Sequence, residues 1–174
     1  MTLERIGGIL LGVAALVGVV ALLTTRDRST LRAPSGPGVQ LPDLGNSRAA
    51  PGAAPSSFGA APPASGPHAP VPVHRDGVRL SADQVLRALE LGDVVLVYRS
   101  RAAEHALRAL TDAMAAPFSP GLAAAGDAVV LDHDPRYRGV TALAWRHVLH
   151  ARSPADPALG GFVSYWLGLG ARHN

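Results

Sequence analysis

The hydrophobic residues form one continuous N-terminal run and several shorter, periodic segments after residue 75. Residues 6–23 contain no charge, and the run reaches twenty residues if it is extended to residue 25. A helix of about 20 apolar residues crosses the ~30 Å hydrocarbon core of a bilayer. We therefore predict a five-residue tail (1–5) and one membrane-spanning helix over residues 6–25, which contacts the lipid bilayer. A cleavable signal peptide is the alternative, but the run is longer than usual and no A-x-A precedes Arg26.

The charges that flank this helix give two opposed predictions of orientation. Arg26, Arg28 and Arg32 follow the run, and only Arg5 precedes it. Positively charged residues favour the cytoplasmic side, which predicts a C-terminal part inside the cell. A very short leader before one long apolar segment is instead typical of signal anchors that export their C-terminal domain. We expect a single-pass protein of the cell membrane with its C-terminal part outside the cytoplasm, and the cytoplasmic orientation stays open.

A segment rich in small residues and proline comes after the predicted helix. Pro, Gly, Ala and Ser make up 30 of the 43 residues from 33 to 75. Such a composition buries too little apolar surface to offset the conformational entropy of an ordered chain. Residues 26–61 are therefore predicted to be a disordered, semi-extended tether, and residues 62–171 a globular domain with a short tail at 172–174.

From the start of this domain, hydrophobic residues recur at the spacings of helices and strands. Ser81 and Gln84 have the spacing of a capping box, and the apolar positions after them follow one helix face until Gly92. Residues 93–99 form a near-continuous apolar run, which is typical of a strand covered on both faces. The pattern predicts a short helix that leads into a buried strand.

The remaining elements are predicted from similar signals. Ser100 can cap a second helix that ends near residue 116, before two prolines. Residues 127–131 and 140–149 have strand character, and the turn-rich segment between them suggests an antiparallel pair. Asp156 followed by proline is typical of the start of a last helix, whose apolar residues have helical spacing.

These elements define an α/β (or α+β) domain. With residues 77–80 as a first strand, the element order is β-α-β-α-β-β-α, which is the order of a thioredoxin-like fold. Element order alone does not establish function. In that fold the redox motif would come after Tyr98, but the chain contains no cysteine, which excludes thiol chemistry, iron–sulfur clusters and cysteine-ligated zinc.

The charge distribution argues against a nucleic-acid partner. All 16 basic residues are arginine, and this usage together with abundant Ala, Gly and Pro indicates a GC-rich genome. Ten arginines and ten acidic residues balance one another from residue 76 to 174. The net charge of +3 therefore belongs to the N-terminal segment, and the predicted domain lacks the basic surface of a nucleic-acid binder.

The seven histidines are the other candidates for chemistry. Asp132, His133 and Asp134 precede a proline, and we interpret them as an exposed turn rather than as metal ligands. No motif of a nucleophilic enzyme, metalloprotease or nucleotide-binding protein is present. His68 stands out because it lies in a proline-rich segment that needs no histidine.

Three segments resemble a bacterial family called domain of unknown function 3105. They are PPASGPH at 62–68, RALELGDVVLVYR at 87–99, and TALAWRHVL with the later FVSYWLGLG. The family usually reads SGPHY and HALEHG in the first two segments, and often carries an N-terminal membrane anchor. Here Arg87 and Leu91 stand at the two histidine positions, whereas His68 and Glu90 are retained.

The resemblance implies a site around His68, Arg87 and Glu90. We interpret the protein as a non-catalytic binding or accessory module, without a cofactor, for a membrane or envelope partner. The alternative is a metal site in which His68 and Glu90 are joined by His147 or His105. A third interpretation gives His68 a structural role, as a hydrogen-bonded latch between the tether and the domain.

Overall fold

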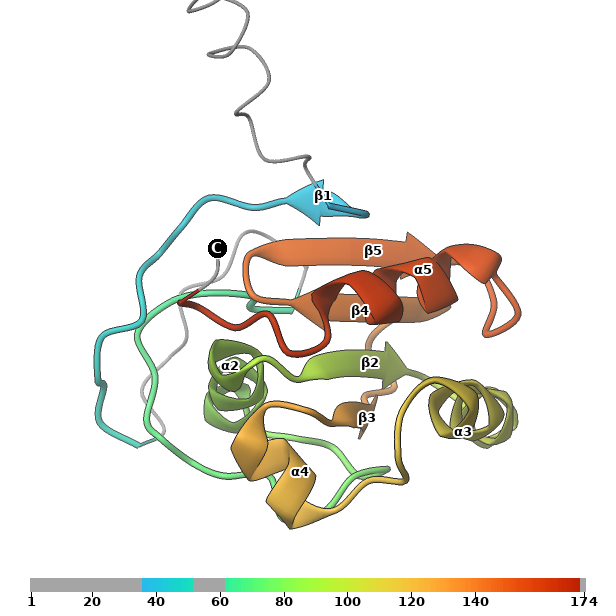
Figure 1. Ribbon diagram of the computed structural model, residues 1–174, viewed down its shortest axis with the longest axis horizontal. Helices are drawn as coiled ribbons and strands as arrows, with labels where there is room; N and C mark the ends of the chain where they lie inside the picture. The colour runs from blue at the N-terminus through green and yellow to red at the C-terminus, as the bar shows by residue number, and fades with distance from the viewer. Residues whose placement is uncertain (1–35, 52–61, 173–174) are drawn as a thin grey trace, which may run out of the picture. The chain divides into compact units, whose positions relative to one another are not determined.

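The computed structural model of the protein describes residues 36–51 and 62–172 (Figure 1). The predicted tail at 1–5 and the predicted membrane helix at 6–25 lie outside these ranges. Within them, no helix has the length and apolar character needed to cross a bilayer.

The described residues form a mixed α/β fold around one five-stranded sheet, which confirms the fold class. Its strands are β1 (Val39–Gln40), β2 (Val94–Tyr98), β3 (Val129–His133), β4 (Val140–Ala144) and β5 (His147–Ala151). The sheet order is β1-β5-β4-β2-β3. Only β2 and β3 are parallel, and the other neighbours are antiparallel.

In the described part of the chain, four helices pack around this sheet. They are α2 (Ala82–Leu91), α3 (Arg101–Met114), α4 (Pro120–Ala125) and α5 (Pro157–Trp166). Ser81 accepts a hydrogen bond from the Gln84 amide and forms the predicted capping box, while Ser100 and Asp156 cap α3 and α5. These local signals appear as expected because each cap supplies an acceptor to a free helical N–H within the same few residues.

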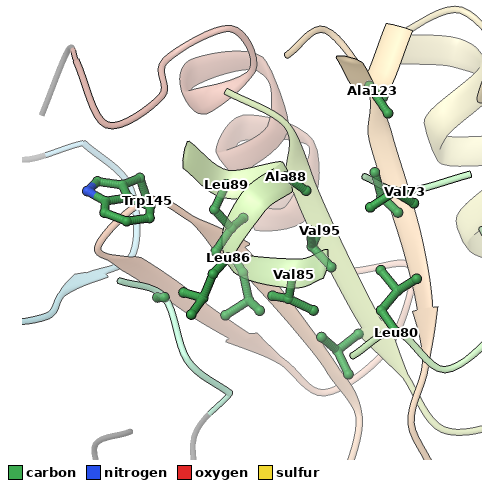
Figure 2. Close-up of a cluster of buried hydrophobic side chains, with 14 of the residues drawn as sticks. Val73, Leu80, Val85, Leu86, Ala88, Leu89, Val95, Ala123 and Trp145 are labelled. Carbon is green, nitrogen blue, oxygen red and sulfur yellow. The ribbon is translucent and has the colours of Figure 1, made fainter. Parts of the chain in front are cut away.

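The helices cover the sheet on both sides and create two apolar layers (Figure 1). On one side, α2 packs its Val85, Leu86 and Leu89 toward Val95 of β2, and α4 contributes to the same layer (Figure 2). On the other side, α3 and α5 pack against alternate residues of the same strands. The strand β2 is buried at all five positions because both of its faces are covered.

The expected antiparallel pairing of residues 127–131 with residues 140–149 is wrong. The strand β3 pairs in parallel with β2, and β4 lies on the opposite side of β2. The most apolar strand, β2, takes an interior position, where both neighbouring strands satisfy its backbone and both helical layers cover its side chains. The short segment after β3 therefore crosses the sheet end instead of closing a hairpin.

Three element boundaries also differ from the expectation. Residues 140–149 contain two strands rather than one, because Arg146 has a φ of 62° and turns the chain into a hairpin. Residues 77–80 contribute an isolated parallel bridge between Val78 and Asp132 rather than a full strand. The helix α4 is an addition to the predicted elements; its Ser119 cap and Pro120 start it only six residues after α3 ends.

The expected disordered tether does not hold for residues 36–51. The strand β1 extends the sheet beside β5, and the Trp166 indole donates to the Pro37 carbonyl over 2.9 Å. A Cβ on Gly36 would lie 2.3 Å from the Trp166 ring, so only glycine permits this approach. The segment is thus held by its backbone groups, which a composition-based prediction does not count.

Candidate functional site

The structure brings together His68, Arg87 and Glu90, the three residues predicted for a site. Arg87 and Glu90 lie one turn apart on α2, and His68 reaches Glu90 from the segment that precedes the helix. The His68 Nε2 atom is 3.2 Å from Glu90 Oε2, and Arg87 Nη1 donates to the same oxygen over 2.5 Å. Glu90 therefore joins a histidine and an arginine from two parts of the chain.

The His68 ring is buried, and both of its nitrogens contact other protein groups, so neither is free to bind a ligand. Its side chain is 2% exposed, and its Nδ1 atom donates to the Gly66 carbonyl over 2.9 Å. The Gly66 carbonyl contacts Nδ1 and the Glu90 carboxylate contacts Nε2, so both ring nitrogens are occupied. The Trp145 ring lies beside it, with 6.1 Å between centroids.

Glu90 is held in its charged form. Burial alone would raise the pKa of this carboxyl, but hydrogen bonds from Arg87 and His68 outweigh burial and lower the pKa below its usual 4.5. The stability that these contacts contribute is thus present above pH 4.5 and is lost as the pH falls through the lowered pKa.

The backbone of His68 anchors a second segment. Its amide donates to the Ser47 carbonyl, and its carbonyl accepts from the Ala49 amide, each over 3.1 Å. Side chain and backbone together connect three parts of the chain: residues 47–49, the His68 segment and α2. This geometry is that of a latch between the 36–51 segment and the domain.

The two histidines considered as further metal ligands do not join the His68 site. His147 contacts other residues, and His105 lies on a different helix. The His147 ring stacks on Trp166 with 3.9 Å between centroids and donates from Nδ1 to the Trp145 carbonyl. His105 lies on the exposed face of α3. The described part of the chain contains no group of three His, Cys, Asp or Glu side chains placed to hold a metal ion. The geometry therefore does not join His147 or His105 to His68 and Glu90.

Arg87 borders a small hollow that the sequence did not indicate. The hollow has a volume of about 130 Å³ and lies between α2, α4 and residues 70–73. Asp93 lines it with a side chain that is 1% exposed. Its Oδ1 accepts from the Ala128 amide over 2.8 Å, whereas its Oδ2 has no hydrogen-bond partner among the described residues. Burial, helped by the charge of Asp127, raises the pKa of Asp93 to about 8.

A larger cleft of about 420 Å³ lies at the carboxyl ends of β2 and β3. We call it the arginine cleft. Its lining is Arg75, Asp76, Gly77, Val78, Arg101, Glu104, Arg108 and His133. Arg108 donates to Glu104 over 2.9 Å and to Asp76 over 3.3 Å. Arg75 and Arg101 are exposed, and neither makes a hydrogen bond or salt bridge with any described residue.

Several contacts join the residues at the floor of the arginine cleft. A Cβ on Gly77 would lie 2.6 Å from Arg108 Nη2, so glycine lets the backbone touch the Arg108–Glu104 pair. The His133 ring packs on Tyr98 at 5.2 Å and donates from Nε2 to the Arg99 carbonyl. The buried Tyr98 hydroxyl lies near Glu104 without a hydrogen bond of ordinary geometry. Arg75 and Arg101 line the same cleft without a salt bridge to these residues.

The expected exposed turn at residues 132–134 is wrong. Asp132 and His133 end β3, and the Asp132 and Asp134 side chains are buried. Asp132 accepts from the Leu80 amide over 2.9 Å, and burial raises its pKa to about 6. A hydrogen bond from Arg136 lowers the pKa of Asp134. The donor to Asp132 comes from a distant segment, whereas Arg136 contacts Asp134 within the turn itself. The turn-like sequence did not indicate that both carboxylates are buried.

Comparison with known proteins identifies a family but no characterised relative. The sequence profile described as protein of unknown function (DUF3105) matches residues 53–169. No curated protein and no solved structure matched the chain. The match spans the His68 cluster, the hollow beside Asp93 and the arginine cleft. The chain therefore belongs to the DUF3105 family of proteins of unknown function.

Proposed function

We propose that this protein is a single-pass, membrane-anchored binding module without catalytic activity, and that its domain binds an oxyanion in the arginine cleft. The anchor would be residues 6–25, and a membrane or envelope protein would be its partner. The bound group is a phosphate or carboxylate, because guanidinium groups pair with the two oxygens of such groups.

The observation that carries this proposal is that Arg75 and Arg101 form no salt bridge with a described residue, although the charge of Arg101 helps to lower the pKa of Glu104. Arg108 is already paired with Glu104 and Asp76, whereas Arg75 and Arg101 make no such pair with a described residue. Arg101 is also the first residue of α3, where free backbone amides add positive potential. Open α/β sheets bind ligands outside the carboxyl ends of their strands, which is the location of this cleft.

We also propose that the fold is thioredoxin-like. From the Val78 bridge onward, the elements run α2, β2, α3, α4, β3, β4, β5 and α5, which is the predicted order with one added helix. On this interpretation the arginine cleft lies where the redox motif would come after Tyr98. Because the chain has no cysteine, that position is available for binding rather than for thiol exchange.

Phosphate binding tests the arginine cleft. Titration of inorganic phosphate into the full chain in neutral detergent should show saturable binding, and Arg101→Ala should weaken it about tenfold, as expected for one lost charge-assisted pair. Arg152→Ala is the matched control, since Arg152 is exposed after β5 and away from the cleft. Equal affinity in the two variants would contradict the proposed site.

The source of the oxyanion and the anchor require separate measurements. Vesicles of phosphatidylglycerol should be compared with neutral vesicles, because preference for the former that Arg101→Ala removes would identify a lipid headgroup. Alkaline phosphatase fused behind Asn174 should be active in cells if the domain lies outside the cytoplasm. Fluorescence of a fusion that matures only before export, without phosphatase activity, would instead place it inside.

A further inference from the structure

The hollow beside Asp93 is lined mainly by apolar side chains, and its two charged lining residues are Arg87 at the rim and Asp93 at the floor. Its lining is Pro70, Pro72, Val73, Arg87, Ala88, Leu91, Asp93, Ala123 and Ala124. Figure 2 shows Val73, Ala88 and Ala123 in this region, between α2, α4 and the segment before α2. A volume of about 130 Å³ holds roughly four water-sized groups, such as a short alkyl chain with one polar end.

One oxygen of the Asp93 carboxyl, at the floor of the hollow, lacks a hydrogen-bond donor in the described part of the chain. Asp93 Oδ1 is satisfied by the Ala128 amide, but Oδ2 is buried without a partner among the described residues. A buried carboxyl oxygen without a hydrogen bond is costly and rare in folded proteins. A ligand that donates a hydrogen bond to Oδ2 would remove this cost.

The electrostatic surroundings favour a cationic donor. Asp93 directly follows the C-terminal end of α2, and Asp127 follows that of α4. Helix C-termini carry partial negative charge, and the Asp127 carboxylate adds to it. The positive charge of Arg87 at the rim is offset by its 2.5 Å contact with Glu90.

We propose that this hollow binds a primary ammonium group on a short alkyl chain, with the ammonium donating to Asp93 Oδ2 and the chain packed on the proline, valine and alanine side chains. Both a small amine and the lysine side chain of a partner protein carry this group. The site is separate from the arginine cleft and does not depend on oxyanion binding there.

The direct test is titration of n-propylammonium into the full chain in neutral detergent at pH 8. We expect saturable binding, with n-propanol and tetramethylammonium binding about tenfold more weakly, because the first lacks the charge and the second lacks N–H donors. A peptide with a blocked N-terminus and one lysine forms the second arm. Tighter binding of the peptide would identify a partner's lysine as the source, and tighter binding of the amine would identify a small molecule.

Two variants locate the bound group. Asp93→Asn should weaken n-propylammonium binding about tenfold or more, because an amide gives no charged acceptor. Ala124→Leu should have a similar effect by filling the mouth of the hollow. Ala125→Leu is the matched control, because Ala125 is an exposed neighbour on α4 that does not line the hollow. Binding that is unchanged in Asp93→Asn, or equal in the two alanine variants, overturns the proposal.

The pH dependence of binding gives an independent readout. The ammonium competes with a proton for Asp93, so one proton leaves the carboxyl for each ammonium bound. Arg87 and Glu90 from α2 and Asp127 after α4 are the other charged groups at this end of the hollow. Affinity should therefore rise about tenfold per pH unit from pH 6 toward pH 8, and affinity independent of pH overturns the assignment to Asp93.

Discussion

Replacing His68 with alanine is expected to lower the free energy of unfolding by about 3 kcal/mol. The ring is buried against Trp145, so its removal leaves a cavity. The substitution also leaves the Gly66 carbonyl without its donor and removes one of the two contacts that hold Glu90. Chemical denaturation of the full chain at pH 7 would measure this loss.

The matched control is His74→Ala, because His74 is exposed a few residues later in the same segment. This control should change stability by less than about 0.5 kcal/mol. Hydrogen exchange of the Ala49 amide should accelerate in His68→Ala, since this amide donates to the His68 carbonyl. Similar stability of the two alanine variants would show that His68 is no latch and would make it a candidate ligand again.

Replacing Asp93 with asparagine is expected to flatten the dependence of stability on pH. The pKa of this carboxyl is about 8 in the folded protein and 3.8 when unperturbed, so between these values the unfolded chain releases a proton that the folded protein retains. Between these two pKa values, the contribution of Asp93 to the free energy of unfolding therefore falls by about 1.4 kcal/mol for each unit that the pH rises. From pH 6 to pH 7.5, Asp93→Asn should gain about 2 kcal/mol relative to the unsubstituted protein.

Measurement above pH 6 separates Asp93 from Asp132, whose raised pKa of about 6 gives a similar slope only at lower pH. Asp112→Asn is the control, because Asp112 is exposed on α3. Parallel pH profiles for Asp93→Asn and the unsubstituted protein would contradict a neutral, buried carboxyl at this position. A stable Asp93→Asn variant also means that its loss of ammonium binding cannot be attributed to unfolding.

The two proposed sites lie at different ends of the same sheet strand. Asp93 lies just before β2 and lines the hollow. Arg101 is the first residue of α3, after β2, and lines the arginine cleft. One site would accept an ammonium and the other an oxyanion. The variants Asp93→Asn and Arg101→Ala can therefore fail independently, so a negative result at one site leaves the other testable.

The sequence alone determined the starts of α2, α3 and α5, the buried strand β2 and the residues of the His68 cluster. Capping side chains such as Ser81, Ser100 and Asp156 act within three residues, so their effect can be inferred without knowing the fold. The apolar run of β2 likewise required burial on both faces wherever the strand lay. His68 and Glu90 stood out as family positions, and they meet in space.

Only the tertiary structure decided the strand order, the packing of residues 36–51 against the sheet, and the two cavities. The pairing of β3 with β2 and the seating of residues 36–51 depend on contacts between segments far apart in the chain, such as Trp166 with Pro37. The unpartnered oxygen of Asp93 and the absence of a salt bridge from Arg101 to a described residue likewise depend on how separate elements pack. Sequence patterns indicate which residues need burial or a partner, whereas the packing of the whole chain decides which of them receive one.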